Sequence, residues 1–248
     1  MDRLIFTAAS GMTAAMNRQR VIASNMSNSE TTGFRAETLQ STPMTLDGPQ
    51  LEVRSMNQTQ VKGADMKSGT VVQTGNGLDV AMQGDVMLAV QTPDGKEGYT
   101  RRGDLSISAT GLLQNGDGLP VLGQGGPITV PTGSKITISE DGSVMSSDPS
   151  KPSEAPTEVD RLKLVNYSGT RIEKDLTGIF RVPNGGILPD DDTAKITVGA
   201  LEGSNVKPTE VMVEMVEAQR SFDMRTKLIA TAKELDQSGA SLMRISAG

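Results

Sequence analysis

The C-terminal part of the chain keeps one apolar spacing over its whole length, and this most constrains the fold. No proline follows Pro208. The spacings from 224 to 245 are 4, 3, 4, 3, 4 and 3, through Met224, Leu228, Thr231, Leu235, Ser238, Leu242 and Ile245. This is the heptad spacing of a coiled-coil seam. With Ser204 and Asn205 as caps before Pro208, the pattern predicts one helix over 209–245, about 55 Å long.

The N-terminal part carries a second helical pattern, over residues 2–28. Its apolar stripe is close to a 3.6-residue period and predicts a helix of about 40 Å. The stripe consists of Leu4, Ala8, Met12, Ala15, Ile22 and Met26. Because the only two long helices lie at the chain ends and have compatible stripes, we expect them to pair.

The middle of the chain is typical of an antiparallel β domain. Short alternating runs such as LDVAM (78–82), KITIS (135–139) and KITV (195–198) are separated by Gly-containing turns. These turns include PDG (93–95), NGDG (115–118), EDG (140–142) and PNGG (183–186). Such turns favour hairpin connections between short strands.

These patterns predict an α+β fold: long terminal helices paired as a coiled-coil-like rod domain, and a central antiparallel all-β domain. Four segments follow from them. They are an N-terminal helix and turn (1–35), an extended arm or linker (36–76), the β domain (77–203) and a C-terminal coiled-coil helix (204–248). The predicted helix seam comprises Leu4, Ala8, Met12, Ala15, Ile22, Met224, Leu228, Leu235, Leu242 and Ile245.

Composition excludes most enzyme chemistry. The chain has no Cys and no His, which removes thiolate nucleophiles, imidazole bases and the usual zinc ligands. A net charge of −6 with scattered Lys and Arg argues against nucleic acid as a partner. The longest apolar run, 86–90, is too short to span a bilayer. The sequence therefore predicts no catalytic residues, no metal, no cofactor and no membrane insertion.

Three motifs with known chemistry have simpler explanations. The tripeptide RGD at 102–104 is interpreted as a hairpin turn between strands. The acidic run 190–192 and the turn 115–118 lack the spaced oxygens of a calcium loop. Two Gly-rich stretches, 75–80 and 123–127, precede no predicted helix and so are not phosphate cradles. Two alternatives stay open, namely a secreted adhesin that uses RGD and an acid–base enzyme such as a glycosidase.

Both chain ends resemble a known family. ASNMSNSETTGFR (23–35) is similar to the N-terminal signature of the flagellar rod and hook family, and LEGSNVKPTEVMVEMVEAQRSFDMRTKLIAT (201–231) is similar to its C-terminal signature. Residues 78–123 also resemble the β domain of the rod proteins. The matching signature residues are Asn25, Asn28, Thr31, Gly33, Phe34, Arg35, Ser204, Asn205, Val206, Gln219, Arg220 and Phe222.

The resemblance implies a structural, non-enzymatic subunit of the basal-body rod, the shaft that transmits torque across the periplasm. Its implied partners are further copies of itself, other rod proteins and the flagellar type III export apparatus, and it implies export without a cleaved signal peptide. About 40 residues separate Phe34 from the run at 78–82, which favours a proximal over a distal rod protein. We expect Phe34 to contact the C-terminal helix or a neighbouring subunit.

Overall fold

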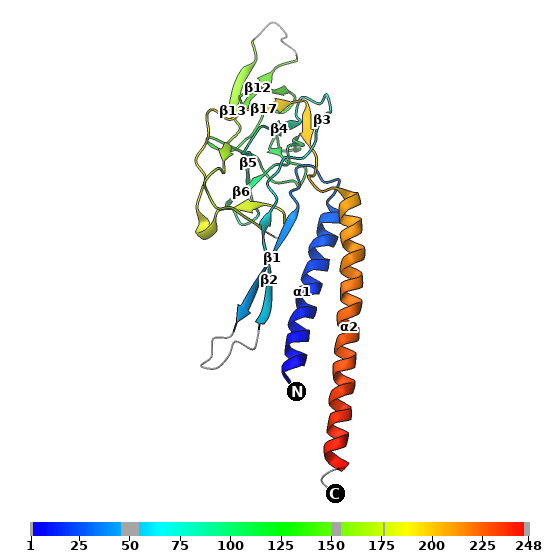
Figure 1. The fold of residues 1–248 in the computed structure, drawn as a ribbon. Coiled ribbons are helices and arrows are strands. Elements are labelled where there is room, and N and C mark those ends of the chain that lie inside the picture. Colours follow the sequence, from blue (N-terminus) through cyan, green and yellow to red (C-terminus); the bar gives the residue numbers. More distant parts are fainter. Residues whose placement is uncertain (1, 46–54, 150–154, 176, 246–248) are drawn as a thin grey trace. The chain divides into compact units, whose positions relative to one another are not determined.

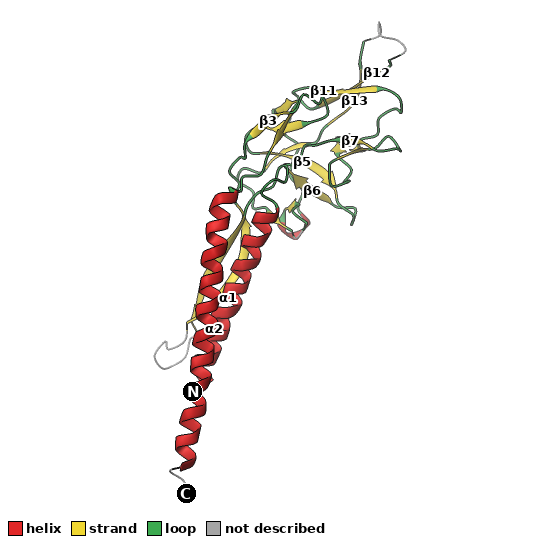
Figure 2. Cartoon of the chain, turned by 90° about the vertical axis from the view of Figure 1, so that its right-hand side faces the viewer, coloured by secondary structure: helices red, strands yellow, loops and turns green. Residues whose placement is uncertain are grey.

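A computed structural model describes residues 2–45, 55–149, 155–175 and 177–245. The chain divides into two compact units. The first consists of Met1–Ser27, Glu37–Lys62 and Lys207–Gly248, and the second of Asn28–Ala36 and Gly63–Val206. Both helices, red in Figure 2, belong to the first unit, and most of the strands, yellow in Figure 2, belong to the second.

The helical unit contains two helices and a hairpin. Helix α1 (Asp2–Ser27) and helix α2 (Pro208–Ile245) run side by side, as Figure 1 shows. Strands β1 (Glu37–Thr45) and β2 (Ser55–Ala64) form a two-stranded sheet, and β1 also contacts α1. The segment predicted as an arm thus supplies the hairpin.

No helix among the described residues is long and apolar enough to cross a membrane.

The prediction that the two helices pair as a coiled-coil-like rod domain is wrong. Met224 and Leu228 of the predicted seam are 62% and 66% exposed. The buried face of α2 instead includes Val211 and Ala218. Helix α2 thus carries a second apolar stripe, which includes Val211 and Ala218, beside the predicted seam. Because both stripes have a similar period, the heptad spacing does not determine which of them is buried.

Polar groups also take part in the contact between the two helices. The side-chain amide of Gln19 donates to the Gln219 side-chain oxygen at 3.1 Å. Arg225 Nη1 donates to the Gly11 carbonyl at 2.6 Å, and a Cβ on Gly11 would lie 2.6 Å from that nitrogen. A guanidinium seated against a glycine differs from the apolar knobs-into-holes packing of a coiled coil.

The strand-rich unit is an antiparallel assembly, as its sequence predicts. Its largest sheet has five strands in the order β14-β5-β6-β16-β15, and β11-β12-β13 form a three-stranded sheet. The remaining strands pair as β10-β9, β17-β4, β18-β3 and β7-β8. The bounds are β3 Val71–Gln73, β4 Val80–Met82, β5 Val86–Gln91, β6 Glu97–Thr100, β7 Ser106–Ile107, β8 Leu113–Gln114, β9 Leu122–Gly123, β10 Gly126–Pro127, β11 Lys135–Ile138, β12 Ser143–Ser147, β13 Thr157–Arg161, β14 Leu164–Asn166, β15 Glu173–Lys174, β16 Phe180–Arg181, β17 Ile196–Val198 and β18 Ala200–Glu202, with a short 3-10 helix at Pro183–Gly185.

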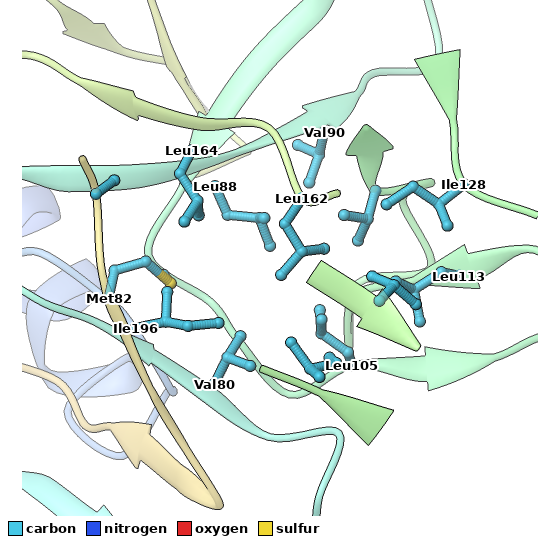
Figure 3. Packing of buried hydrophobic residues seen from close by; sticks show 14 of the residues in the cluster. Val80, Met82, Leu88, Val90, Leu105, Leu113, Ile128, Leu162, Leu164 and Ile196 are labelled. Carbon is cyan, nitrogen blue, oxygen red and sulfur yellow. The ribbon is translucent and has the colours of Figure 1, made fainter. Parts of the chain in front are cut away.

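Strand β5 divides the core of this unit in two. Alternate side chains of a strand point to opposite faces of the sheet. Val86, Leu88 and Val90 enter the larger apolar cluster, part of which Figure 3 shows around Leu88, Leu162 and Ile196. Met87 and Ala89 enter the smaller cluster on the other face, with Tyr99 and Phe180. Burial on both faces explains why 86–90 is an unbroken apolar run.

Tyr99 gives the smaller cluster a measurable property. Its side chain is fully buried, its phenol oxygen accepts the Leu188 amide at 2.7 Å, and burial raises its pKa to about 12. The unfolded pKa is about 10, so stabilisation by the protonated phenol is complete below pH 10 and is lost as the pH rises from 10 to 12. Burial also raises the pKa of Tyr167, the only other tyrosine.

We therefore expect alkaline titration, followed by phenolate absorbance, to show no ionisation of native Tyr99 near pH 10. Tyr99→Phe serves as the control, since it removes this signal and leaves that of Tyr167. Ionisation of Tyr99 at pH 10 with an unchanged far-UV circular dichroism spectrum would contradict the burial.

Candidate functional site: where the two signature segments meet

Residues 28–36 and 202–206 lie together in the strand-rich unit, although they are far apart in sequence. Gly33 donates its amide to the Glu202 carbonyl at 2.7 Å, and Asn205 donates its amide to the Phe34 carbonyl at 3.3 Å. Two turn bonds, from the Thr31 amide to the Asn28 carbonyl and from the Phe34 amide to the Thr31 carbonyl, fold the first segment. The two signatures thus form one structural site.

Glu202 is the centre of this site. Arg35 Nη2 donates to Glu202 Oε1 at 2.7 Å, and the Gly69 amide donates to the same oxygen at 2.8 Å. Arg101, the residue after β6, donates its Nε and Nη2 to Glu202 Oε2. The side chains of Arg35, Arg101 and Glu202 are 1%, 2% and 0% exposed, respectively. Such burial of charge is tolerated only with several bonds to each ion.

Arg101 also holds the backbone between the end of β4 and the start of β5. Its Nη1 donates to the carbonyls of Gly84 and Val86, at 2.7 and 2.6 Å, and its Nη2 donates to the Met82 carbonyl at 2.8 Å. Burial lowers the pKa of this guanidinium and the Glu202 carboxylate opposes the change. Through Arg101, the signature segments are connected to β4 and β5.

Arg35 is less completely bonded than Arg101. Among the described residues, its buried Nε and Nη1 have no hydrogen-bond acceptor. Two guanidinium groups face one carboxylate, so the cluster carries an excess positive charge. Its stability therefore depends strongly on Glu202.

Gly33 lets the first segment approach this cluster closely. Its φ is +68°, a conformation that non-glycine residues rarely adopt. A Cβ here would lie 2.4 Å from the Arg101 backbone carbon. Both the turn and the close approach therefore require glycine.

Asn205 joins three segments instead of capping α2 as predicted. Its side-chain oxygen accepts the Ala36 amide at 2.7 Å. Its side-chain nitrogen donates to the carbonyls of Asp65 and Lys67 at 2.7 and 2.9 Å. These partners occupy both N–H donors of the amide and one lone pair of its oxygen. Its neighbour Ser204 accepts the Val206 amide at 3.2 Å, and Val206 is buried.

The Phe34 ring lies beneath a cation of β15. Lys174 Nζ is 3.6 Å from the ring centroid and donates to the Arg35 carbonyl at 2.8 Å. This is cation–π geometry. The partner that the structure gives Phe34 is thus a lysine of its own unit.

Asn25, from the same signature, lies in the helical unit. It is buried, and its side chain pairs with the backbone of Glu37 in both directions. Asn25 Oδ1 accepts the Glu37 amide at 2.8 Å, and Nδ2 donates to the Glu37 carbonyl at 3.1 Å. An amide side chain can pair in this way because it carries both a donor and an acceptor. The residue thereby fixes the end of α1 to the start of β1.

The other predicted site residues lie along the helices. In α1, Met12 and Ala15 are half-buried and Ile22 is buried; the side chains of Leu4 and Ala8 lie outside the described part. In α2, Arg220 is exposed and Phe222 half-buried, and the side chains of Leu235, Leu242 and Ile245 lie outside it.

The motifs set aside in the sequence have local partners. RGD is not a hairpin turn: Asp104 bridges antiparallel to Asp79, and Arg102 holds Asp104 with two bonds of 2.8 and 2.9 Å. Asp191 bonds Thr193, which lowers the pKa of that carboxyl, whereas Asp192 pairs with Arg161. Within the described residues, no group of three or more acidic side chains is placed to hold a metal ion.

Glu202 and Arg101 were missed by sequence reasoning. Charged residues are usually exposed, and neither lies in an apolar pattern that would predict burial. The available signal was that Glu202 falls inside the C-terminal signature, next to Ser204 and Asn205.

Comparisons with known proteins match three parts of the chain. Residues 5–35 match the family described as flagella basal body rod protein, and residues 81–146 match the flagellar hook protein FlgE/F/G D1 domain. Residues 197–242 match the flagellar basal body rod FlgEFG protein C-terminal family. The flagellar basal-body rod protein FlgF of Salmonella typhimurium is 40% identical over 99% of this chain and 100% of the relative. The chain belongs to the flagellar basal-body rod protein family.

Other members agree with this assignment. FlgF of Escherichia coli K12 is 39% identical over 94% of this chain and 95% of the relative. FlgG of Bacillus subtilis is 30% identical over 98% of this chain and 100% of the relative. The predicted resemblance to the flagellar rod family is confirmed. The protein is a structural subunit of the rod in the flagellar basal body, as its relatives are.

Proposed function

We propose that the chain is a non-enzymatic subunit of the proximal rod, built into a helical assembly that transmits torque. Its partners are further copies of itself and other rod proteins. It reaches them through the flagellar type III export apparatus. Its membership of the rod family supports this proposal.

The observation that carries the proposal is an exposed apolar surface on α2. We call it the α2 apolar surface, and it comprises Met212, Val213, Met215, Val216, Met224 and Leu228. Met212 and Val216, like Met224 and Leu228, are four residues apart and so lie one helical turn from each other. Met212 and Val216 thus form one exposed apolar pair and Met224 and Leu228 a second, and adjoining exposed apolar side chains typically mark a protein–protein contact.

The signature residues have a proposed role in the same assembly. The cluster of Arg35, Arg101 and Glu202 fixes the two signatures in one geometry inside each subunit. The predicted helix seam acts in our proposal through its exposed members, Met224 and Leu228. A rigid cluster of this kind suits a subunit that must carry load.

The adhesin alternative is less well supported. Arg102 is bonded to Asp104 and donates to Asp117 at 2.6 Å, so the two charges of RGD neutralise each other. An adhesive tripeptide must present its arginine and aspartate to a receptor separately.

Leu228→Asp tests the α2 apolar surface. In a strain that lacks the native chain, we expect this variant to abolish swimming, because a charge would be buried against a neighbouring subunit. Swimming and the yield of purified hook–basal bodies are the measurements.

Leu228→Met is the matched control, since it keeps an apolar side chain of similar volume. It is expected to swim normally. Because residue 228 is exposed in the single chain, both variants should keep wild-type thermal stability. Normal swimming of Leu228→Asp would overturn the proposed surface.

A further inference from the structure

The methionines that the structure describes differ widely in exposure. The sequence contains 14 Met and no Cys, so thioethers are its most readily oxidised groups. On α2, Met212, Met215 and Met224 are 49%, 41% and 62% exposed. In the strand-rich unit, Met82 and Met87 are 3% and 0% exposed. One chain therefore offers both accessible and protected thioethers.

Peroxide converts an exposed thioether into a polar group. The methionine sulfur attacks one oxygen of hydrogen peroxide, the O–O bond breaks and an S–O bond forms. The sulfur is oxidised to a sulfoxide, the peroxide is reduced, and the second oxygen leaves as water. The product is polar and disrupts Met-rich contacts, and reductases can restore the thioether.

We propose that Met212, Met215 and Met224 are peroxide-modification sites that control assembly. Oxidation before incorporation places polar sulfoxides on the α2 apolar surface and so prevents its burial against a neighbouring subunit. The inference rests on the proposed function of that surface, to which it adds regulation. Within one turn of these sulfurs lie Val216 and Leu228, whose burial the sulfoxides would oppose.

Peptide mapping tests the modification itself. The purified full-length chain is treated with hydrogen peroxide, and sulfoxide at each methionine is followed by mass spectrometry. We expect Met212, Met215 and Met224 to react at least about tenfold faster than Met82 and Met87, which must await opening of the fold. Equal rates in a sample with unchanged circular dichroism would overturn the proposal.

Two triple variants test the consequence. Replacing the three methionines by Leu keeps the surface apolar and removes the sulfur, whereas replacing them by Gln imitates the polar product. In a strain lacking the native chain, the Leu triple is expected to form hook–basal bodies at the wild-type yield. The Gln triple is expected to lower that yield at least about tenfold while keeping its helical circular dichroism.

A peroxide arm isolates the effect from general stress. When synthesis of the chain is induced under sublethal peroxide, the yield of hook–basal bodies should fall for the wild type and fall less for the Leu triple. Equal inhibition of the two, or normal assembly of the Gln triple, would overturn the proposal. Normal swimming of Leu228→Asp would instead overturn the proposed function. If Leu228→Asp fails to assemble but the Gln triple assembles normally, the proposed function stands and only the control by oxidation is rejected.

Discussion

Glu202→Gln is expected to lower the free energy of unfolding of the strand-rich unit by about 3–5 kcal/mol, the usual effect of removing one partner from a buried ion pair. The change leaves the Arg35 and Arg101 guanidinium groups buried and facing each other without their carboxylate. Urea unfolding followed by tyrosine fluorescence is a suitable measurement, because Tyr99 and Tyr167, the only tyrosines, both lie in this unit.

Glu173→Gln is the matched control. Glu173 pairs with Arg171 at 2.8 Å, but the two side chains are 49% and 78% exposed. Loss of such a surface pair changes stability by about 1 kcal/mol or less. If the two substitutions have equal effects, Glu202 is not the centre of the site.

Gly33→Ala is the second change with a large expected effect. The alanine would have to adopt φ +68°, and its methyl group would lie 2.4 Å from the backbone of Arg101. We expect a loss of about 3 kcal/mol or more in the same urea experiment, since conformational strain and steric overlap add.

Gly75→Ala separates those two contributions. Gly75 has φ +75° and lies in the same unit, yet a Cβ there meets nothing within 4 Å. Only the conformational cost applies, about 1 kcal/mol. An equal loss at both positions would show that the approach of Gly33 to Arg101 is unimportant.

The sequence predicted the strand-rich unit better than the helical one. Gly95, Gly118, Gly142 and Gly185 all have positive φ in the turns that were predicted. Each turn signal is local, since in all four turns the glycine directly follows Asp or Asn, a pair that favours a turn whatever surrounds it. Strands bounded by such turns are therefore readable from short windows of sequence.

For the helical unit, the sequence does not determine which apolar stripe of α2 is buried. Helix α2 carries two apolar stripes of similar period, and its local pattern is satisfied by burying either one. The structure buries the stripe of Val211 and Ala218 within the chain and leaves Met224 and Leu228 exposed. A stripe reserved for another subunit and a stripe for the chain's own core have the same spacing.

The candidate site was predicted in part. The signature residues Gly33, Arg35 and Asn205 were selected through family resemblance, and the structure places them together. Their bonds could not be predicted, because Arg35 and Glu202 are 167 positions apart and no local period relates them. The sequence predicted that Asn205 caps a helix, but its side chain instead bonds to two other segments, at Ala36 and at 65–67.

The pairing of Arg35 with Glu202 joins an early and a late part of the chain. Residues 28–36 are made early and Glu202 late, so this contact has high contact order. In a chain synthesised from its N-terminus, Arg35 lacks this partner until a further 167 residues have been added, up to residue 202 of 248. The strand-rich unit therefore cannot complete this cluster until most of the chain has been synthesised.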